Sequence, residues 1–348
     1  MAVITIIGAG QMGSALAFVA GENGNTIRMV GTPHDKALID ALRDGGEHPI
    51  FGRHFQEGTE FYYTEQWQDA VKGSDFVVAG VSSYGVDWFL EEILLKLDAD
   101  IPVLSAAKGL TETEDGELIS YPVYWERELL KKGIKRDICA LGGPGTADEI
   151  AHHDHTMVAV CGVDPAVRET ISKSFDNSYF HVSTTSDVMG LEYSVAIKNA
   201  FALGVAIAIG YMSVKDEDKS RAHVNTQAAV FYQAAKEMSK LLESIGAEYN
   251  SLLIGLGDLY VTVSGARTRK IGILLGEGKT YEQAQEMLGG ITLESVVIVR
   301  RLYSSLRKRE LRGEVKLSDY PLLTYIVELL DGHKYQDLPW DKFSFDVK

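Results

Sequence analysis

The sequence is poor in cysteine and in positive charge, and each shortage argues against a class of protein. Only two cysteines, Cys139 and Cys161, occur among 348 residues, both in apolar, strand-like settings. We therefore expect two free core thiols and no disulfide framework. The 34 lysines and arginines are outnumbered by 49 aspartates and glutamates, which gives a net charge of −15. This balance argues against nucleic acid or an anionic membrane surface as a partner.

Long uninterrupted apolar runs are also scarce. The best candidate, residues 194–210, is too short to cross a membrane and contains the charged Lys198. At the amino terminus, a strand-like run at residues 3–7 leaves no room for a signal sequence. We therefore expect a soluble, cytoplasmic protein with no membrane span.

The first half of the chain alternates between strand-like and helix-like segments. The length of the whole chain favours about two domains. Short apolar segments predict strands at residues 3–7, 26–30, 75–81, 102–105, 138–141 and 156–161. Helical patterns fall between and after them at 11–21, 33–44, 66–72, 86–97, 122–132 and 165–176. This alternation predicts an α/β domain over residues 1–187, a Rossmann-type, doubly wound parallel sheet.

The second half has a different pattern. Strand-like runs become rare after about residue 188, and helical patterns follow at 190–211, 217–246, 267–276, 280–288, 292–306 and 319–330. We therefore predict an all-α, substrate-binding domain over residues 188–348. The tail at 333–348 has no clear period and is not assigned.

A glycine-rich turn follows the first predicted strand. In GAGQMG, Gly8, Gly10 and Gly13 have the GxGxxG spacing, with Gln11 and Met12 between them. Gly8 allows the tight turn, Gly10 lets the backbone approach a pyrophosphate, and Gly13 lets helix and strand pack closely. The strand–turn–helix context predicts a dinucleotide site at the start of the helix.

The end of the second predicted strand bears on the choice between NAD and NADP. An acidic residue there normally accepts hydrogen bonds from the ribose hydroxyl groups of NAD. Residues 31–33 are Gly-Thr-Pro instead, and Thr32, His34 and Lys36 are suited to a 2′-phosphate. Asp35 is the competing candidate, although it lies later and is expected to start a helix. The pattern leans toward NADP and leaves NAD open.

Two lysines stand among small or apolar residues. Lys108, in SAAKGL, lies at the end of a predicted strand, where ligands bind in open α/β sheets. Lys198, followed by Asn199, lies in a helix that is apolar on all sides, so it should either reach solvent or line a cleft between the domains. A lysine in such a cleft can exchange a proton with a reacting oxygen.

Two more segments carry polar groups suited to a phosphorylated substrate. The glycine turn at residues 142–145, GGPG, ends a predicted strand and offers backbone amides. In GLGDLYVTVSGARTRKIG, Asp258 is a candidate partner for Lys198. Arg267 and Thr268 start a predicted helix and are suited to holding a phosphate.

Taken in order, these motifs resemble the soluble, bacterial and archaeal type of NAD(P)-dependent glycerol-3-phosphate dehydrogenase, from residue 3 to about 330. The resemblance implies a Rossmann domain, an all-α domain, and usually a homodimer. It also implies interconversion of dihydroxyacetone phosphate and sn-glycerol 3-phosphate, the backbone of glycerophospholipids, with NADP or NAD as cofactor.

The resemblance also implies site residues. Lys198 matches the proton donor and acceptor of the family, Arg267 an arginine that reaches both phosphate and cofactor, and Glu294 a cofactor-contacting glutamate. The predicted catalytic residues are Lys198, Lys108 and Asp258. The predicted cofactor-binding residues are Gly8, Gly10, Gln11, Met12, Gly13, Thr32, Lys108, Arg267 and Glu294. The predicted substrate-binding residues are Lys108, Gly143, Lys198, Asn199, Asp258, Arg267 and Thr268.

The chain departs from the family pattern near the substrate. The family usually reads Ser-Arg-Asn-Arg-Arg where residues 266–270 read Ala-Arg-Thr-Arg-Lys. Gly145 stands where the family has a serine, and Asp148 where it has a lysine. These differences keep open a relative that acts on another polyol or sugar phosphate.

Other classes of protein share part of this pattern. The 3-hydroxyacid and 6-phosphogluconate dehydrogenases also combine a Rossmann domain with a lysine-asparagine helix, but the GLGDL segment argues against them. A non-catalytic NAD(P)-sensing protein would not need Lys108, Lys198 and Asp258 together. Residues 152–155 read HHDH, but adjacent side chains in a loop cannot all face one ion, so we expect no metal site.

Overall fold

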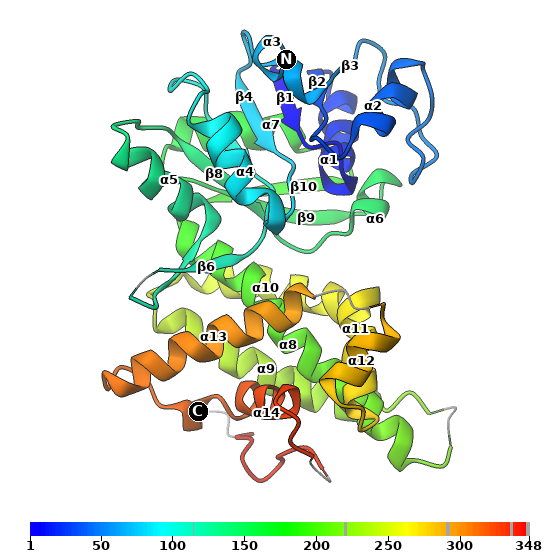
Figure 1. Ribbon diagram of the computed structural model, residues 1–348, viewed down its shortest axis with the longest axis vertical. Coiled ribbons are helices and arrows are strands. Elements are labelled where there is room, and N and C mark those ends of the chain that lie inside the picture. The colour runs from blue at the N-terminus through cyan, green and yellow to red at the C-terminus, as the bar shows by residue number, and fades with distance from the viewer. Residues whose placement is uncertain (114, 219–220, 290–292, 335–336, 346–348) are drawn as a thin grey trace. The chain divides into compact units, whose positions relative to one another are not determined.

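The computed structural model describes residues 1–348 apart from 114, 219–220, 290–292, 335–336 and 346–348 (Figure 1). The chain divides into two compact units. The first comprises Met1–Lys108 and Ser120–Glu192, and the second comprises Gly109–Ile119 and Tyr193–Lys348. This division differs from the single predicted boundary after residue 187, because Gly109–Ile119 belongs to the second unit.

The first unit contains an eight-stranded sheet with strand order β10-β9-β8-β5-β4-β1-β2-β3. Its strands are β1 (Val3–Ile7), β2 (Thr26–Val30), β3 (Glu60–Tyr62), β4 (Phe76–Ala79), β5 (Val103–Ser105), β8 (Ile138–Gly142), β9 (Thr156–Cys161) and β10 (Phe180–Thr185). The predicted Rossmann-type α/β class is confirmed. The sheet is not parallel throughout, because β9 runs antiparallel to β8.

Helices flank this sheet because its strands are apolar on both faces. They are α1 (Gln11–Glu22), α2 (Lys36–Arg43), α3 (Trp67–Ala70), α4 (Val86–Phe89), α5 (Tyr121–Lys131), α6 (Ala147–Ala151) and α7 (Pro165–Phe175). Successive strand side chains point to opposite faces, so Ile6 packs in one core cluster with Phe18. Ile7 packs in the other cluster with Trp125.

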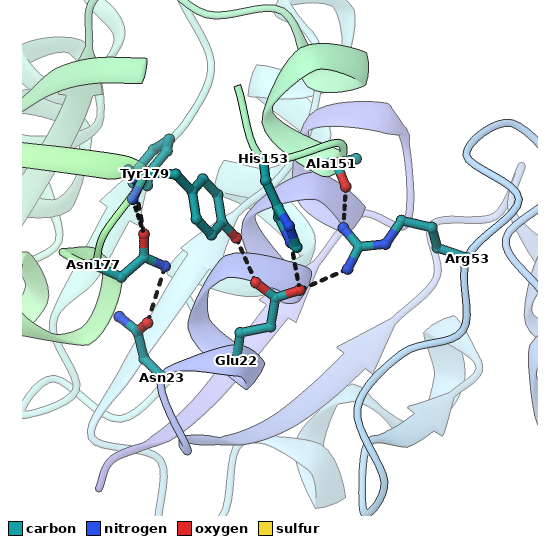
Figure 2. A network of polar contacts seen from close by, with 8 residues as sticks. Glu22, Asn23, Arg53, Ala151, His153, Asn177 and Tyr179 are labelled. Atoms are coloured by element: carbon teal, nitrogen blue, oxygen red, sulfur yellow. Dashed lines mark hydrogen bonds and ion pairs between the residues drawn. The ribbon is translucent and has the colours of Figure 1, made fainter. Parts of the chain in front are cut away.

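A polar network around Glu22 fastens the carboxyl end of α6 to α1 (Figure 2). The Glu22 carboxylate accepts hydrogen bonds from the Tyr179 hydroxyl at 2.6 Å and from the Arg53 guanidinium at 2.6 Å. The His153 ring lies 3.0 Å away, and Arg53 also donates to the carbonyl of Ala151. Burial alone would raise the pKa of Glu22, but the bonds from Tyr179, His153 and Arg53 hold it below its ordinary value. The network thereby fixes the helix that follows the glycine turn at 142–145.

The second unit is mostly helical. Its helices are α8 (Val188–Lys215, which begins in the first unit), α9 (Val224–Glu243), α10 (Tyr249–Ser264), α11 (Ala266–Gly276), α12 (Tyr281–Met287), α13 (Glu294–Leu311) and α14 (Pro321–Leu330). The predicted helical fold of residues 188–348 is confirmed. The hairpin of β6 (Leu110–Glu112) and β7 (Leu118–Ser120), which comes from the first half of the chain, also packs with this unit. Arg301 and Lys308 of α13 bind β6, through the carbonyl of Leu110 and the carboxylate of Glu112.

Helix α8 forms the centre of the second unit. Among the described residues, one helix is long and apolar enough to cross a membrane by length and composition, and that helix is α8. However, 78% of its most apolar window is buried within the protein, as expected for a core helix. Its glycines allow very close packing, because a Cβ at Gly210 would lie 2.0 Å from the carbonyl oxygen of Ile273 in α11.

Within the described residues, two helices (α6 and α10) and four strands (β3, β6, β7 and β10) were not predicted. Helix α10 was missed because Gly255 and three β-branched residues at 261–263 weaken its helical pattern. Strand β10 was missed because it is a polar strand at the edge of the sheet, and α6 because it has only five residues. The predicted state of the cysteines is confirmed, since Cys139 and Cys161 are buried, free thiols.

Candidate active site

The three glycines of the first turn are required for different reasons. Gly8 has a φ of +115°, and a Cβ there would lie 2.5 Å from the carbonyl oxygen of Gly80. A Cβ at Gly13 would lie 2.1 Å from the carbonyl oxygen of Gly8. A Cβ at Gly10, in contrast, would meet no protein atom within 4 Å. The fold itself requires Gly8 and Gly13, whereas Gly10 borders open space of the kind that a pyrophosphate needs.

The first turn of α1 is suited to an anion. Gln11 is exposed and Met12 is half-buried, and no acidic side chain lies in this described first turn. The N-cap residue, Gly10, has no side chain that could occupy the free amides of the helix. The amides and the helix dipole can therefore act together on a phosphate, so these residues fit a dinucleotide.

The predicted cofactor contact Thr32 lies half-buried just after β2. Its amide and its hydroxyl both donate to Asp35, at 2.8 and 2.7 Å. Asp35 is the N-cap residue of α2, as expected from the sequence. His34 and Lys36, on either side of it, are exposed.

Lys108 and Gly143 meet in the first unit. The Lys108 ammonium donates to the carbonyl oxygen of Gly143 at 2.8 Å. Both residues line a pocket together with Met12 and Gly145. Gly143 has a φ of +139°, and a Cβ there would lie 2.9 Å from the backbone of Val158. The predicted glycine turn thus lies beside the predicted lysine and the start of α1.

Glu192 is a buried carboxyl that is not among the predicted site residues. It is 1% exposed, and its Oε2 has no hydrogen-bond partner within the described parts of the chain. Burial raises the pKa of Glu192 to about 8, although the nearby charge of Lys108 acts in the opposite direction. The available signal was a lone acid at the start of the apolar run EYSVAIKN.

The second unit brings Lys198 and Asp258 together. The Lys198 ammonium donates to Asp258 Oδ1, and the two residues are 7% and 1% exposed. The pair forms because α8 and α10 approach closely, and a Cβ at Gly255 would lie 2.7 Å from the Cβ of Ser194. Ser194 precedes Lys198 by one helical turn, as Gly255 precedes Asp258, so this contact aligns the two charged side chains.

Burial of this pair has an energetic consequence. Each charge loses its hydration, and only their mutual attraction and further hydrogen bonds offset that loss. An apolar pair of similar volume is often at least as stable. The pair is therefore poorly explained by stability alone, which is typical of a functional group.

The remaining predicted residues lie elsewhere in the second unit. Asn199 follows Lys198 in α8 and is half-buried. Arg267 and Thr268 lie in the first turn of α11, with Arg267 exposed and Thr268 half-buried. Glu294 is the exposed first residue of α13. None of these four takes part in the Lys198–Asp258 ion pair itself.

The histidines at 152–155 point to different partners. His152 lies beside Asp148, whereas His153 bonds to Glu22 and His155 lies 3.0 Å from His181. Within the described residues, no group of three or more histidine, cysteine or acidic side chains is arranged to hold a metal ion.

Comparison with known proteins identifies the family. Residues 3–167 match the N-terminus of NAD-dependent glycerol-3-phosphate dehydrogenase, and residues 187–338 match its C-terminus. The chain is 30% identical over 346 residues to an NADP(+)-dependent glycerol-3-phosphate dehydrogenase of Archaeoglobus fulgidus, which covers 99% of each chain.

Two solved structures share the fold. A glycerol-3-phosphate dehydrogenase from Coxiella burnetii has a TM-score of 0.75 at 21% identity, covering 97% of this chain and 96% of that chain. The enzyme from Saccharomyces cerevisiae has a TM-score of 0.79 at 20% identity, covering 96% of both. With both family regions matched in order, the chain belongs to the NAD-dependent glycerol-3-phosphate dehydrogenase family of NAD(P)-dependent oxidoreductases.

Proposed function

We propose that the protein interconverts dihydroxyacetone phosphate and sn-glycerol 3-phosphate with a nicotinamide cofactor and supplies glycerophospholipid synthesis. The observation that carries this proposal is the buried Lys198–Asp258 pair. A buried ammonium held by a carboxylate is suited to exchanging a proton with a carbonyl oxygen. Family membership supports the substrate, and the name of the Archaeoglobus relative states the same activity.

Three residues of the chain have separate roles in the proposed reaction. When bound, the reduced nicotinamide supplies hydride to the carbonyl carbon. Lys198 donates its proton to the carbonyl oxygen as the alcohol forms and accepts it in the reverse direction. Asp258 accepts a hydrogen bond from Lys198 and orients its ammonium group. The positive charge of Lys108 stabilises negative charge that develops on the oxygen, an effect that is strong where water is excluded.

The substrate phosphate is assigned to the start of α11. Arg267 anchors the phosphate and reaches the cofactor, while the Thr268 hydroxyl adds a donor. Asn199 and the backbone of Gly143 orient the remaining polar atoms of the substrate. Binding energy from the phosphate then positions the reacting carbon. Glu294 is assigned a contact with the cofactor.

The cofactor is proposed to be NADP(H) in preference to NAD(H). Three features support this: the NADP(+) dependence stated in the name of the Archaeoglobus relative, the lack of an acid at residues 31–33, and the exposed His34 and Lys36. Gly8, Gly10, Gln11, Met12 and Gly13 are proposed to hold the pyrophosphate, with Thr32 and Lys108 as further contacts. We also propose that the protein acts in the cytoplasm as a homodimer, as is usual in this family.

The proposal is tested by following oxidation of NADPH and of NADH at 340 nm with dihydroxyacetone phosphate and a panel of other ketose phosphates. Turnover with dihydroxyacetone phosphate is expected. Turnover only with another compound would favour a related polyol phosphate dehydrogenase, as Thr268 and Gly145 allow. Tight cofactor binding without turnover on any substrate would indicate a sensing protein.

A further inference from the structure

One oxygen of Asp35 accepts three hydrogen bonds. The amide of Thr32 donates to Oδ2 at 2.8 Å and the hydroxyl of Thr32 at 2.7 Å. The amide of Ala9 donates to the same oxygen at 3.3 Å. Asp35 is the N-cap residue of α2, yet its carboxylate does not cap that helix and turns toward the two loops instead. Three donors that converge on one charged oxygen form an anion site.

This anion site lies at the ligand-binding edge of the sheet. Strands β1 and β2 are parallel, with Ile7 opposite Val30, and the amide of Gly8 continues the ladder to the Val30 carbonyl at 2.8 Å. Ala9 and Thr32 therefore follow the carboxyl ends of adjoining strands. In a dinucleotide-binding sheet, the adenosine ribose and its 2′ substituent lie at the end of the second strand.

We propose that Asp35 sets the choice between NADH and NADPH, because its carboxylate fills an anion site that a 2′-phosphate would otherwise enter. The inference rests on the proposed function only in that the protein binds a nicotinamide dinucleotide. The carboxylate repels a 2′-phosphate and keeps three donors occupied. Its Oδ1 accepts none of these three bonds and remains suited to a ribose hydroxyl. The exposed cations His34 and Lys36 act in the opposite direction.

The absence of an acid directly after β2 then has a physical explanation. The expected acid is missing from residues 31–33, but a carboxylate from residue 35 turns back and reaches the turn. The protein should therefore use NADH as well as NADPH. Its preference for NADPH should be weaker than that of the same loop without the Asp35 carboxylate. Removing the Asp35 carboxylate should therefore increase the preference for NADPH over NADH.

The test is direct cofactor binding to Asp35→Ala, measured as dissociation constants for NADPH and NADH by fluorescence titration without substrate. The affinity ratio in favour of NADPH should rise by about 10- to 100-fold, as expected for gained bonds to a charged group. Adenosine 2′-monophosphate should gain affinity over the 5′-monophosphate in the same direction. Asp44→Ala is the matched control, because it removes one exposed acid at the other end of α2 and should leave the ratio unchanged.

A second variant, Asp35→Asn, keeps the side-chain volume and should shift the ratio in the same direction by a smaller factor. An unchanged ratio in both variants, or equal weakening of both cofactors, would overturn the proposal and leave Asp35 as a residue that only fixes the loops. If the unaltered protein binds neither cofactor, the proposed function fails as well. That result is distinct, because it appears before any variant is compared.

Discussion

Lys198 and Asp258 depend on each other for stability and, in the proposed mechanism, for chemistry. Each carries a charge that is removed from water. The two residues lie 60 positions apart in the sequence. Under the proposed mechanism, a change to one of them should therefore alter both folding and turnover. Activity data from a single variant would confuse the two effects.

Lys198→Met should lower kcat by about 10²- to 10⁴-fold, the usual contribution of a general acid. It should also lower the melting temperature, because Asp258 stays buried without the ammonium of Lys198. In the double variant Lys198→Met, Asp258→Leu, stability should recover while turnover stays low, since an apolar pair replaces the ion pair. Kinetics with dihydroxyacetone phosphate and calorimetry check both expectations.

The control is Lys240→Met, which removes a lysine from a partly exposed ion pair with Asp319. This variant should be close to the unaltered protein in stability and turnover. Near-normal turnover in either Lys198 variant would show that another group donates the proton.

Among the secondary-structure elements, the turn into α1 offers a matched pair of glycines. Gly10→Ala adds a methyl group to open space, so the melting temperature should hardly change while affinity for NADPH and NADH falls. Gly13→Ala places a methyl group 2.1 Å from the Gly8 carbonyl oxygen and should destabilise the fold. Calorimetry and cofactor titration separate the two effects. Unimpaired cofactor binding by Gly10→Ala would remove the dinucleotide from this turn.

Helix α14 depends on a carboxylate from another helix. Glu237 of α9 is completely buried and accepts the amides of Leu322 and Leu323 at 2.7 and 3.0 Å. These amides belong to the first turn of α14 and have no partner within that helix. Gln233 donates to the same carboxylate at 2.8 Å.

Glu237→Ala should reduce the free energy of unfolding by about 1–3 kcal/mol for each amide left without an acceptor. Glu243→Ala, which removes an exposed acid from the same helix, is the control and should have little effect. Urea denaturation measures both. Equal stability of the two variants would show that water replaces the carboxylate at the start of α14.

For the molecule as a whole, two buried carboxyls contribute to how stability should change with pH. Burial raises the pKa of Glu192 to about 8 and that of Glu237 to about 7, both above the ordinary 4.5. The folded protein therefore keeps protons that the unfolded chain releases. This stabilisation is complete below about pH 4.5 and is lost as the pH rises through 7 and 8.

The free energy of unfolding should consequently fall by a few kcal/mol, in order of magnitude, between pH 5 and 8.5. His48 acts in the opposite direction at the acidic end, because burial lowers its pKa from 6.5. The slope is therefore best measured from pH 6.5 to 8.5. Glu192→Gln should make that slope clearly shallower while Glu237 maintains the rest. An unchanged slope would contradict the assignment for Glu192.

The features of the candidate site were predictable where their signal is local in the chain. The spacing of Gly8, Gly10 and Gly13, the lone Lys198 in an apolar helix and the glycine turn around Gly143 are all contained in short segments. The sequence signal of Glu192 lies in the same short segment as that of Lys198. Glu192 was not predicted as a site residue, because an acid at the start of a helix is common. Its burial emerges only when the surrounding elements pack.

The sequence alone determined the alternation of strands and helices, the change to helices near residue 188 and the family, because periodicity and motifs act over a few residues. Tertiary structure decided which distant groups meet. It joined Lys198 to Asp258 through the glycine contact of α8 with α10, and it turned Asp35 back toward Ala9. It also moved the β6–β7 hairpin into the second unit. These outcomes depend on close packing and on satisfying buried polar groups, which no short segment of the chain specifies.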